Sequence, residues 1–438
     1  MKKSLKTKTK WVVLMQVGLV TACSVTATTA LWQSQAGNDP ATGRLVSSAF
    51  DSTGNLYQLY QEGEYNSPQL QLRLVSSSGT EMWKQEIPAE FDSLSNSYEY
   101  DKVTACDSGV VLSGTFRDKI EKHDNSGNTE WEYDYSAEGN GHDTQVVAAN
   151  DCDLVVTRTL YQTGDTNISI QVDQFSPQGF RVWTQTVNFQ DSAALVKKIT
   201  AYQLANKAVM LLMSGWPAPL MQVVLDNTGT VVREGPLGGA SRALIAADEN
   251  RILLGADDGT VESWNIDGSL AWSQTVPATL GQCANSSATA LLCVATLFSD
   301  YSDELIRFDL ADGTATRYPL NYTGTIKSVT YLGGEKWLLQ ENILVDNKLG
   351  RFIASPYYAR LHILDDITAR ETSTITLQPG KVRQFYIEEF DGYIWGETSP
   401  RDNVQAVHRQ GQQLLTSGWY GYDFQGNGII QAKAYAIK

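Results

Sequence analysis

Short runs of alternating apolar and polar residues, separated by glycine-containing turns, fill most of the chain. The stretch from Asp257 to Val276 is the clearest example, because Val261–Ile266 and Leu270–Val276 both alternate and Asp267-Gly268 lies between them. Alternation is typical of β-strands, and Asp-Gly between two such runs predicts a hairpin because glycine accepts the positive φ of a tight turn. The stretch is therefore predicted to be a β-hairpin.

A tryptophan follows the turn glycine of this hairpin by four residues, and the same spacing recurs along the chain. The tryptophans at this place are Trp83, Trp131, Trp183 and Trp272. Weaker copies keep the turn and lose the indole, at Gly229, Gly313, Gly411 and a degenerate unit in which Thr368 holds the glycine place. On a strand the spacing fixes the face that carries the indole. We interpret these tryptophans as docking one repeat on the next, with a ring of aromatic ligand sites as the alternative.

Each copy is preceded by another predicted hairpin, as at Asp107–Gly109 before Val110–Leu112 and at Asp391-Gly392 before Tyr393–Trp395. Two hairpins make four strands, and units recurring every 39 to 55 residues are typical of propeller blades. The sequence predicts an all-β fold, a single β-propeller over residues 44–438. Eight four-stranded blades are favoured over seven, and the strand pair around Phe424–Gly428 is left over to close the ring with the other terminus.

The first residues predict export. Five lysines in Met1–Lys10 precede the apolar run Trp11–Val20, which is too short to span a bilayer. This order is typical of a signal peptide, here residues 1–22. The tetrapeptide ending at Cys23 resembles a bacterial lipobox, which implies lipidation of Cys23 and a membrane anchor. Cleavage at Ala27 or Ala30 is the alternative. Residues 23–43, rich in Thr, Ala, Ser and Gly, are predicted to be a flexible tether.

The acidic composition bears on which kinds of partner the protein can bind. The 438 residues carry a formal net charge of −15, and removing the lysine-rich start would make the chain still more acidic. Nucleic acid is therefore not expected as a partner, because phosphate contacts need clustered Lys and Arg.

The cysteines beyond Cys23 suit an exported protein. Cys283 and Cys293 flank a predicted turn and would face each other on paired strands. Cys106 and Cys152 lie at matching turns of successive units and could bridge neighbouring blades. The alternative is that all four are buried, reduced thiols.

Catalytic motifs are missing from the sequence. The four histidines are not at metal-ligand spacing, and no G-x-S-x-G, HExxH or phosphate loop appears. His142, next to Asp143, is expected in an exposed loop, and the acidic stretch Ser299–Glu304 lacks calcium-loop spacing and is expected to be a solvated loop. No catalytic, cofactor-binding or metal-ligating residue is assigned.

The glycine-plus-four-tryptophan units resemble those of the pyrroloquinoline-quinone-type propeller superfamily, best in the units that end at the four tryptophans. One branch of that superfamily is catalytic and often carries an adjacent cysteine pair beside the quinone, which this chain lacks. The other branch is similar in layout, with signal, lipobox, tether and eight-bladed ring. It is the lipoprotein scaffold of the outer-membrane β-barrel assembly machinery.

The resemblance implies a non-catalytic lipoprotein that binds an envelope protein partner and needs no cofactor. Ser24 after the lipidated cysteine, by resemblance to sorting in enteric bacteria, implies the outer membrane, with the ring periplasmic or surface-facing. A periplasm-facing enzyme, either quinone-dependent or acting on carbohydrate, and a polysaccharide-binding surface protein are the alternatives, because fold alone does not specify function.

Overall fold

A computed structural model describes most of the chain between residues 27 and 437. The described residues are 27–36, 43–63, 69–88, 91–92, 97–98, 100–115, 119–138, 141–149, 151–160, 168–189, 195–204, 206–216, 220–238, 243–247, 250–285, 289–299, 302–320, 322, 324–344, 357–365, 368–377, 382–387, 392–397, 401–421 and 428–437. Cys23 and the predicted signal peptide lie outside them.

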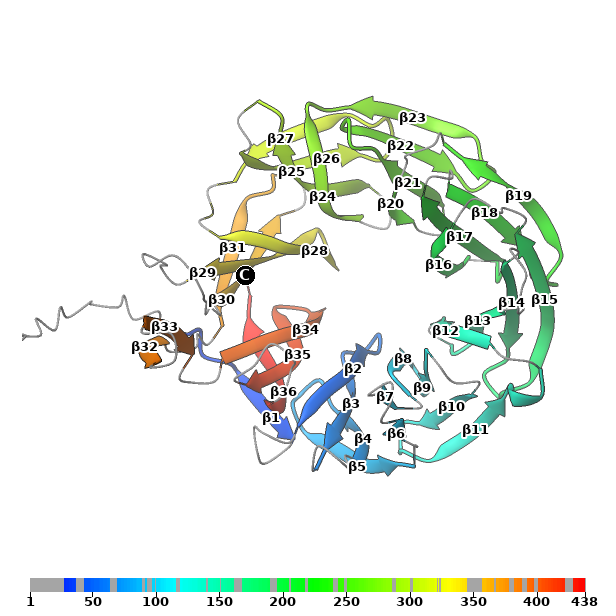
Figure 1. Ribbon diagram of the computed structural model, residues 1–438, viewed down its shortest axis with the longest axis horizontal. Coiled ribbons are helices and arrows are strands. Elements are labelled where there is room, and N and C mark those ends of the chain that lie inside the picture. The colour runs from blue at the N-terminus through cyan, green and yellow to red at the C-terminus, as the bar shows by residue number, and fades with distance from the viewer. Residues whose placement is uncertain are drawn as a thin grey trace, which may run out of the picture.

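Eight four-stranded antiparallel sheets are arranged around a ring (Figure 1). Blades 1 to 4 are β2 (Arg44–Phe50), β3 (Leu56–Glu62), β4 (Gln69–Val75), β5 (Glu81–Ile87); β8 (Lys102–Cys106), β9 (Gly109–Ser113), β10 (Lys119–Asp124), β11 (Thr129–Asp134); β12 (Gly141–Ala148), β13 (Leu154–Leu160), β14 (Ile168–Phe175), β15 (Arg181–Phe189); and β16 (Leu195–Gln203), β17 (Val209–Trp216), β18 (Leu220–Leu225), β19 (Val231–Leu237).

Blades 5 to 8 complete the ring. They are β20 (Ala243–Ala247), β21 (Arg251–Gly255), β22 (Thr260–Asn265), β23 (Leu270–Thr275); β24 (Ala278–Asn285), β25 (Ala290–Leu297), β26 (Asp303–Asp309), β27 (Ala315–Pro319); β28 (Thr325–Gly333), β29 (Lys336–Leu344), β30 (Tyr357–Asp365), β31 (Glu371–Thr376); and β34 (Arg401–Gln410), β35 (Gln413–Gly421), β36 (Gly428–Ala436), β1 (Trp32–Ala36). The prediction of eight blades closed by terminal strands is confirmed.

Closure is made by the outermost strand of blade 8, which comes from the other end of the chain. Strand β1 pairs antiparallel with β36, with Trp32 opposite Ala434 and Ala36 opposite Ile430. This strand lies inside residues 23–43, the stretch predicted to be a tether. The ring therefore begins at Trp32 and not at Arg44, because alternation in Trp32–Ala36 supplies an edge strand that β36 needs as a partner.

The last units of the chain are assigned differently from the sequence interpretation. The turn at Gly411 joins β34 to β35, so it belongs to the inner hairpin of blade 8 and not to an outer one. The predicted hairpin at Asp391-Gly392 is β32 (Val382–Ile387) and β33 (Gly392–Glu397), a separate two-stranded sheet. A second small sheet is β6 (Phe91–Asp92) with β7 (Ser97–Tyr98). The blade count is correct although these hairpins exchange roles.

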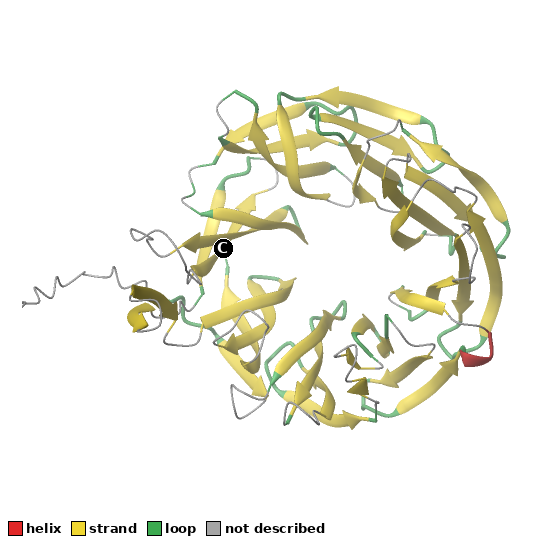
Figure 2. Cartoon of the chain, viewed as in Figure 1, coloured by secondary structure: helices red, strands yellow, loops and turns green. Residues whose placement is uncertain are grey.

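Strands dominate the described residues, and the single helical turn is η1 (Ser136–Glu138), which follows blade 2 (Figure 2). No helix in the described part of the chain is long and apolar enough to cross a membrane.

In blades 1 to 6 the turn between the third and fourth strands uses its glycine in the left-handed region. Gly79 has φ 89° and donates its N–H to Ser76 O at 2.9 Å, and the register of β4 with β5 shifts immediately beside it, between Leu74 and Val75. A residue without Cβ adopts this φ at no steric cost, and the accompanying bulge increases local twist. The positive φ expected of these glycines is confirmed.

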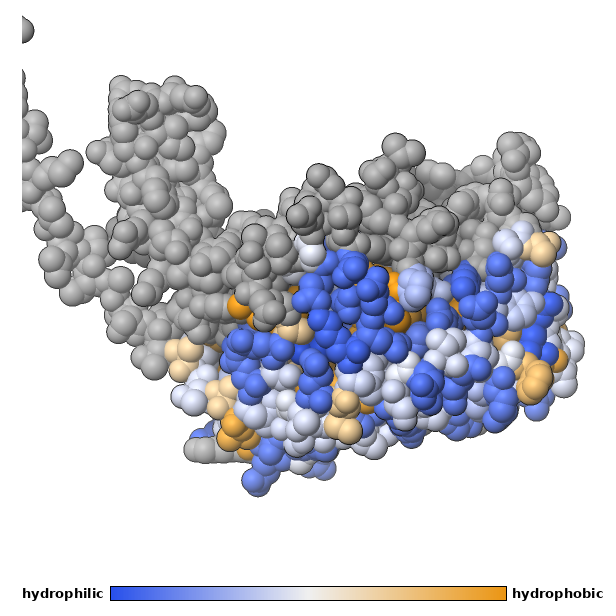
Figure 3. Space-filling model, turned by 90° about the horizontal axis from the view of Figure 1, so that it is seen from below, coloured by the Kyte–Doolittle hydropathy of each residue, from blue (hydrophilic) through white to orange (hydrophobic). Residues whose placement is uncertain are grey.

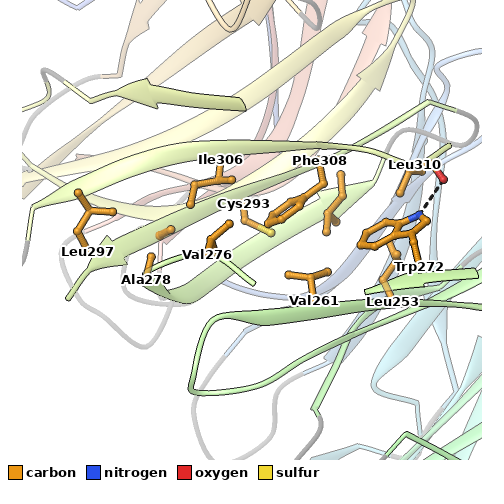
Figure 4. Packing of buried hydrophobic residues seen from close by; sticks show 12 residues of the cluster. Leu253, Val261, Trp272, Val276, Ala278, Cys293, Leu297, Ile306, Phe308 and Leu310 are labelled. Atoms are coloured by element: carbon orange, nitrogen blue, oxygen red, sulfur yellow. Dashed lines mark hydrogen bonds between the residues drawn. The ribbon is translucent and has the colours of Figure 1, made fainter. Parts of the chain in front are cut away.

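The hydrophobic core consists of layers between neighbouring blades rather than one central mass. One layer joins Val155, Ile170 and Val172 of blade 3 to Leu211 and Val223 of blade 4. Each sheet is therefore apolar on both faces along its middle strands, as a blade packed between two others requires. Figure 4 shows the layer between blades 5 and 6.

Candidate functional site

The four predicted tryptophans all lie on the outermost strand of a blade and contact the turn glycine of the next blade. A Cβ placed on Gly179 would lie 2.5 Å from the ring of Trp131, and one on Gly229 would lie 2.7 Å from that of Trp183. Trp83 meets Gly127 and Trp272 meets Gly313 in the same way. The absent side chain of each glycine is what allows the indole to approach.

Hydrogen bonds fix three of these indoles. Trp83 Nε1 donates to Asn125 O at 2.8 Å, and Trp131 Nε1 donates to Pro177 O at 3.1 Å. In the layer between blades 5 and 6, Trp272 Nε1 donates to Leu310 O at 3.0 Å and its ring stacks on Phe308 (Figure 4). The nitrogen of Trp183 has no partner among the described residues.

Sequence reasoning missed a fifth member of this set. Trp32 of β1 lies 2.5 Å from where a Cβ on Gly79 would be, so the junction between blades 8 and 1 is made like the others. The signal was present as the alternation of Trp32–Ala36, but the surrounding Thr, Ala and Ser suggested a linker.

Blade 4 carries Arg233 where blades 1, 2, 3 and 5 carry tryptophan. Its side chain lies over Gly268 and donates to the Asp267 carbonyl, and its Nε donates to Gln222 Oε1 at 2.7 Å. A planar guanidinium thus covers the turn glycine in place of an indole.

Both predicted disulfides are formed. Cys106 and Cys152 join the inner hairpin turns of blades 2 and 3, with 5.3 Å between their Cα atoms. Cys283 of β24 is directly opposite Cys293 of β25, with a Cα separation of 4.1 Å. Neighbouring inner turns are also linked without sulfur, because Ser52 Oγ donates to Asp107 Oδ1 at 2.6 Å and Gln410 Nε2 donates to Thr53 O at 3.0 Å.

A second recurring position was also missed. Six residues before the turn glycine, or before Thr368 in blade 7, most blades place a polar or charged residue on the third strand. The residues are Arg73, Glu121, Asp173, Glu262, Arg307 and His362, with Val223 in blade 4. The recurrence of a polar residue at this fixed distance from the turn was the available signal.

In blade 2 this position holds Glu121. Its carboxylate accepts from Tyr100 at 2.9 Å and from Thr129 at 2.8 Å, and it lies 3.2 Å from His123 Nε2. Burial alone would raise the pKa of Glu121, but the hydrogen bonds outweigh it and lower the pKa from 4.5 to about 2. The other nitrogen of His123 contacts Gln85 of blade 1 at 2.9 Å, so the cluster crosses the junction.

In blade 3 the position holds Asp173, whose side chain is fully buried. Gln171 Nε2 donates to Asp173 Oδ2 at 3.0 Å, and Arg181 lies 3.7 Å away. Burial raises the pKa of Asp173, and the hydrogen bond from Thr184 and the charge of Arg181 offset only part of that effect.

Tyr135, which follows the last strand of blade 2, also contacts the cluster around Asp173. The fully buried Arg158 lies over the ring of Tyr135 at 4.1 Å and donates to Gln171 Oε1 at 3.2 Å. Burial and the charge of Asp173 raise the pKa of Tyr135 well above its usual value. Glu138 of η1 accepts from Arg181 at 2.8 Å, which brings the helical turn onto blade 3.

In blade 7 the position holds His362 between two carboxylates. Its Nε2 lies 2.9 Å from Glu341 Oε2, and its Nδ1 lies 2.6 Å from Glu371 Oε2. Tyr322, from the connection between blades 6 and 7, stacks on the imidazole at 4.2 Å. Burial and the charge of Glu371 raise the pKa of Tyr322. Gly324 N donates to Glu341 Oε1 at 2.7 Å, so this cluster holds the connection between two blades.

The histidine and the acidic stretch that the sequence analysis placed in loops lie on strands where they are described. His142 lies on β12 opposite Thr159, and not in a loop. Glu304 lies on β26 and pairs with Arg317 at 2.6 Å, and Thr296 donates to Asp303 at 2.7 Å, so these two acids belong to a strand rather than a solvated loop. Among the described residues, no three His, Cys, Asp or Glu side chains are placed to hold a metal ion.

One small pocket lies on the blade 8 sheet, next to Leu377. Its volume is about 10 Å³, and Val404, Thr416, Gly418 and Lys433 are among the residues that line it. Pockets that enclose drug-sized ligands have volumes of about 300–1,000 Å³. This one has room for a small group at most.

Comparison with known proteins supports the fold alone. No family model and no curated protein sequence matches the chain. A computationally designed protein, Ika8, is similar with a TM-score of 0.52 at 12% identity, over 90% of this chain and 97% of that one. The Dos1 propeller gives a TM-score of 0.52 at 8% identity, over 93% and 95% of the two chains.

BamB from Moraxella catarrhalis is a more distant structural neighbour. Its TM-score is 0.41 at 12% identity, over 76% of this chain and 96% of that one. At that score the likeness carries no functional argument. The resemblance inferred from the repeats is therefore supported at the level of a β-propeller.

Proposed function

We propose that this protein is a non-catalytic scaffold of the cell envelope, anchored by lipid on Cys23, that holds a protein partner on its propeller. The observation that carries the proposal is the locking of blade to blade at most junctions of the ring. Indoles, an arginine and a disulfide join neighbours, and the clusters around Glu121, Asp173 and His362 lie within or between blades. Buried, mutually bonded side chains of this kind serve rigidity rather than turnover.

A locked ring supports binding because it holds surface segments in fixed positions. Antiparallel topology places the turns within each hairpin on one face, and these turns are short, such as Ser76–Thr80. The connections on the other face are longer, since residues 345–356 alone join β29 to β30. The face formed by the short turns therefore presents exposed acidic residues, among them Asp107, Asp267 and Asp312.

The proposed anchor would hold the ring near the membrane. Only residues 24–31 separate Cys23 from the first strand. An extended chain spans at most about 3.3–3.6 Å per residue, so the ring would lie within about 30 Å of the lipid attachment. A partner is then expected to be in or at the same membrane.

Anchoring is tested by metabolic labelling with a radioactive or clickable fatty acid in the wild type and in Cys23→Ser. We expect label and membrane fractionation only in the wild type. A wild-type protein that carries no label and fractionates as soluble would remove the anchor from the proposal.

Binding is tested by mild chemical cross-linking in whole envelopes, followed by purification under denaturing conditions and identification of the linked chain. We expect one envelope protein in near-stoichiometric yield. Gly179→Val, which distorts a blade junction, is the matched control and should lose that partner. Recovery of the unlinked protein alone, at every cross-linker length, would contradict the scaffold role.

A further inference from the structure

Each blade ends at the rim of the ring in an outermost strand whose far edge is unpaired by any strand of the described residues. An unpaired edge presents free N–H and C=O groups and is a template for another strand, and proteins commonly protect it with charge, proline or short length. The rim strands of this protein differ in how far they are protected.

Most rim strands carry protecting residues in exposed positions. β5 exposes Lys84 and Glu86, and β11 exposes Glu130, Glu132 and Asp134. β19 exposes Glu234 and Pro236, and β27 exposes Arg317 and Pro319. Figure 3 shows the side of the ring that carries β5 and β11, where the visible surface is mostly hydrophilic with isolated hydrophobic residues.

β15 has none of these protections along its length. It is nine residues long, and its exposed residues after the first are Val182, Thr184, Thr186 and Asn188. These are uncharged, and the first three are β-branched, which favours pairing. The one charge, Arg181 at the start of the strand, is held by Glu138.

Exposed apolar side chains lie at the same place. Phe180, immediately before β15, is 73% exposed, and Val182 is 60% exposed. Phe180 is the most exposed large hydrophobic side chain among the described residues. β23 and β1 are also uncharged, but they have only six and five residues. β23 exposes Leu270 at 48%, less than Phe180 or Val182, and otherwise the small Ala271, Ser273 and Thr275.

We propose that β15 is a strand-addition site, at which an extended, uncharged segment of a partner protein pairs with the open edge of blade 3. The segment would alternate β-branched or apolar residues with small polar ones. Main-chain hydrogen bonds would supply affinity, and contacts with Phe180 and Val182 would favour apolar side chains. This inference rests on the proposed function and assigns its binding surface.

A second copy of this chain is the less suitable occupant. Two chains of net charge −15 repel each other. A flexible segment of another protein avoids this repulsion, because it can be uncharged and bring only its own strand.

The test uses the full chain and a synthetic nine-residue peptide of alternating valine and threonine, with a lysine at each end for solubility. Amide hydrogen exchange is measured with and without about 1 mM peptide. We expect exchange in Val182–Asn188 to slow at least tenfold. The same peptide N-methylated at every residue cannot donate main-chain hydrogen bonds from either edge and should give no protection.

The variant Thr184→Lys/Thr186→Glu copies onto β15 the pair that β5 carries at equivalent positions, Lys84 and Glu86. It should lose the protection. Because Thr184 also donates a hydrogen bond to the buried Asp173, the single variant Thr186→Glu is measured beside it; it too should lose the protection, and it should keep the wild-type thermal midpoint because Thr186 is exposed. The matched control, Ser273→Lys/Thr275→Glu on β23, should keep the protection in β15.

Protection that appears on β23 or on another surface, or none in β15, would overturn the assignment. So would a concentration-dependent dimer in sedimentation whose exchange is slowed in β15 without peptide, since that would make a second copy the occupant. Failure here together with a cross-linked envelope partner elsewhere on the ring would leave the scaffold proposal standing.

Discussion

The junction between blades 1 and 2 and the junction between blades 2 and 3 are built on one plan and stabilised differently. In both, a tryptophan of the earlier blade donates to a turn carbonyl of the later one. The first also has the cluster of Glu121, open to several donors. The second has a fully buried carboxylate, Asp173, and the disulfide Cys106–Cys152.

The difference shows that the position of a carboxyl group in the repeat does not determine the direction in which its pKa is shifted. Glu121 and Asp173 both lie six residues before the turn glycine. Hydrogen-bond donors dominate around Glu121 and lower its pKa, while burial dominates around Asp173 and raises its pKa. Equivalent carboxylates in neighbouring blades should therefore respond to pH in opposite directions.

The largest expected effect comes from the disulfide that only the second junction has. The bond between Cys106 and Cys152 closes a loop of 46 residues, and the bond between Cys283 and Cys293 closes one of 10. Loop-closure entropy then assigns about 4 kcal/mol to the first bond and about 2–3 kcal/mol to the second. Replacing each pair by serine and measuring urea unfolding by tryptophan fluorescence tests the order. Equal decreases in the free energy of unfolding would show that loop length does not determine how much each disulfide stabilises the protein.

The next effect compares the turn glycines of the two junctions. Gly127 and Gly179 have φ 88° and 83°, so alanine at either place costs about 1–2 kcal/mol of backbone strain. The new Cβ would lie 3.1 Å from Trp83 in the first case and 2.5 Å from Trp131 in the second. Overpacking should therefore bring Gly179→Ala to about 3 kcal/mol, while Gly127→Ala stays near the strain alone. The free energy of unfolding of both variants measures the difference, and a reversed order would contradict the packing argument.

Glu121→Gln should have a smaller effect that depends on pH. The pKa of Glu121 is lowered in the folded protein, from 4.5 to about 2. Its contribution to stability is therefore present above about pH 4.5 and is lost as the pH falls toward 2. A difference of this size corresponds to about 3 kcal/mol, which nearby solvent reduces to about 1–2 kcal/mol. Unfolding curves at pH 7 and pH 3 should show the variant approaching the wild type in acid. A stability difference between wild type and variant that widens in acid would contradict a lowered pKa of Glu121.

Much of the fold follows from local pattern, because hairpins with a glycine turn and an indole four residues later are short-range signals. The contacts that close the ring are long-range and leave no such local signal. Trp32 was assigned to a tether since its partners, β36 and Gly79, lie far away in the sequence. The hairpin at Gly411 matched the outer-hairpin spacing, but closure by β1 made it an inner one.

The candidate site was less predictable than the fold. The polar position six residues before the turn could have been found by aligning the repeats, but whether burial or hydrogen bonding prevails there depends on neighbours from another blade. Likewise, the open edge of β15 is defined by comparison with the charged edges of β5 and β11. Such comparisons need the strand boundaries first.

Asp173→Asn should have the smallest effect on stability, and its pH dependence should be opposite to that of Glu121→Gln. Because the pKa of Asp173 is raised on folding, the wild type gains stability from this group as the pH falls, and loses it as the pH rises through the folded pKa. The uncharged amide avoids the burial cost at pH 7 and also gives up the attraction to Arg181, so the variant should gain less than about 1 kcal/mol there. Its advantage should shrink in acid, in the direction opposite to the Glu121 stability term. Unfolding in urea at pH 7 and pH 4 measures this, and an advantage that grows in acid would mean that attraction to Arg181, and not burial, governs Asp173.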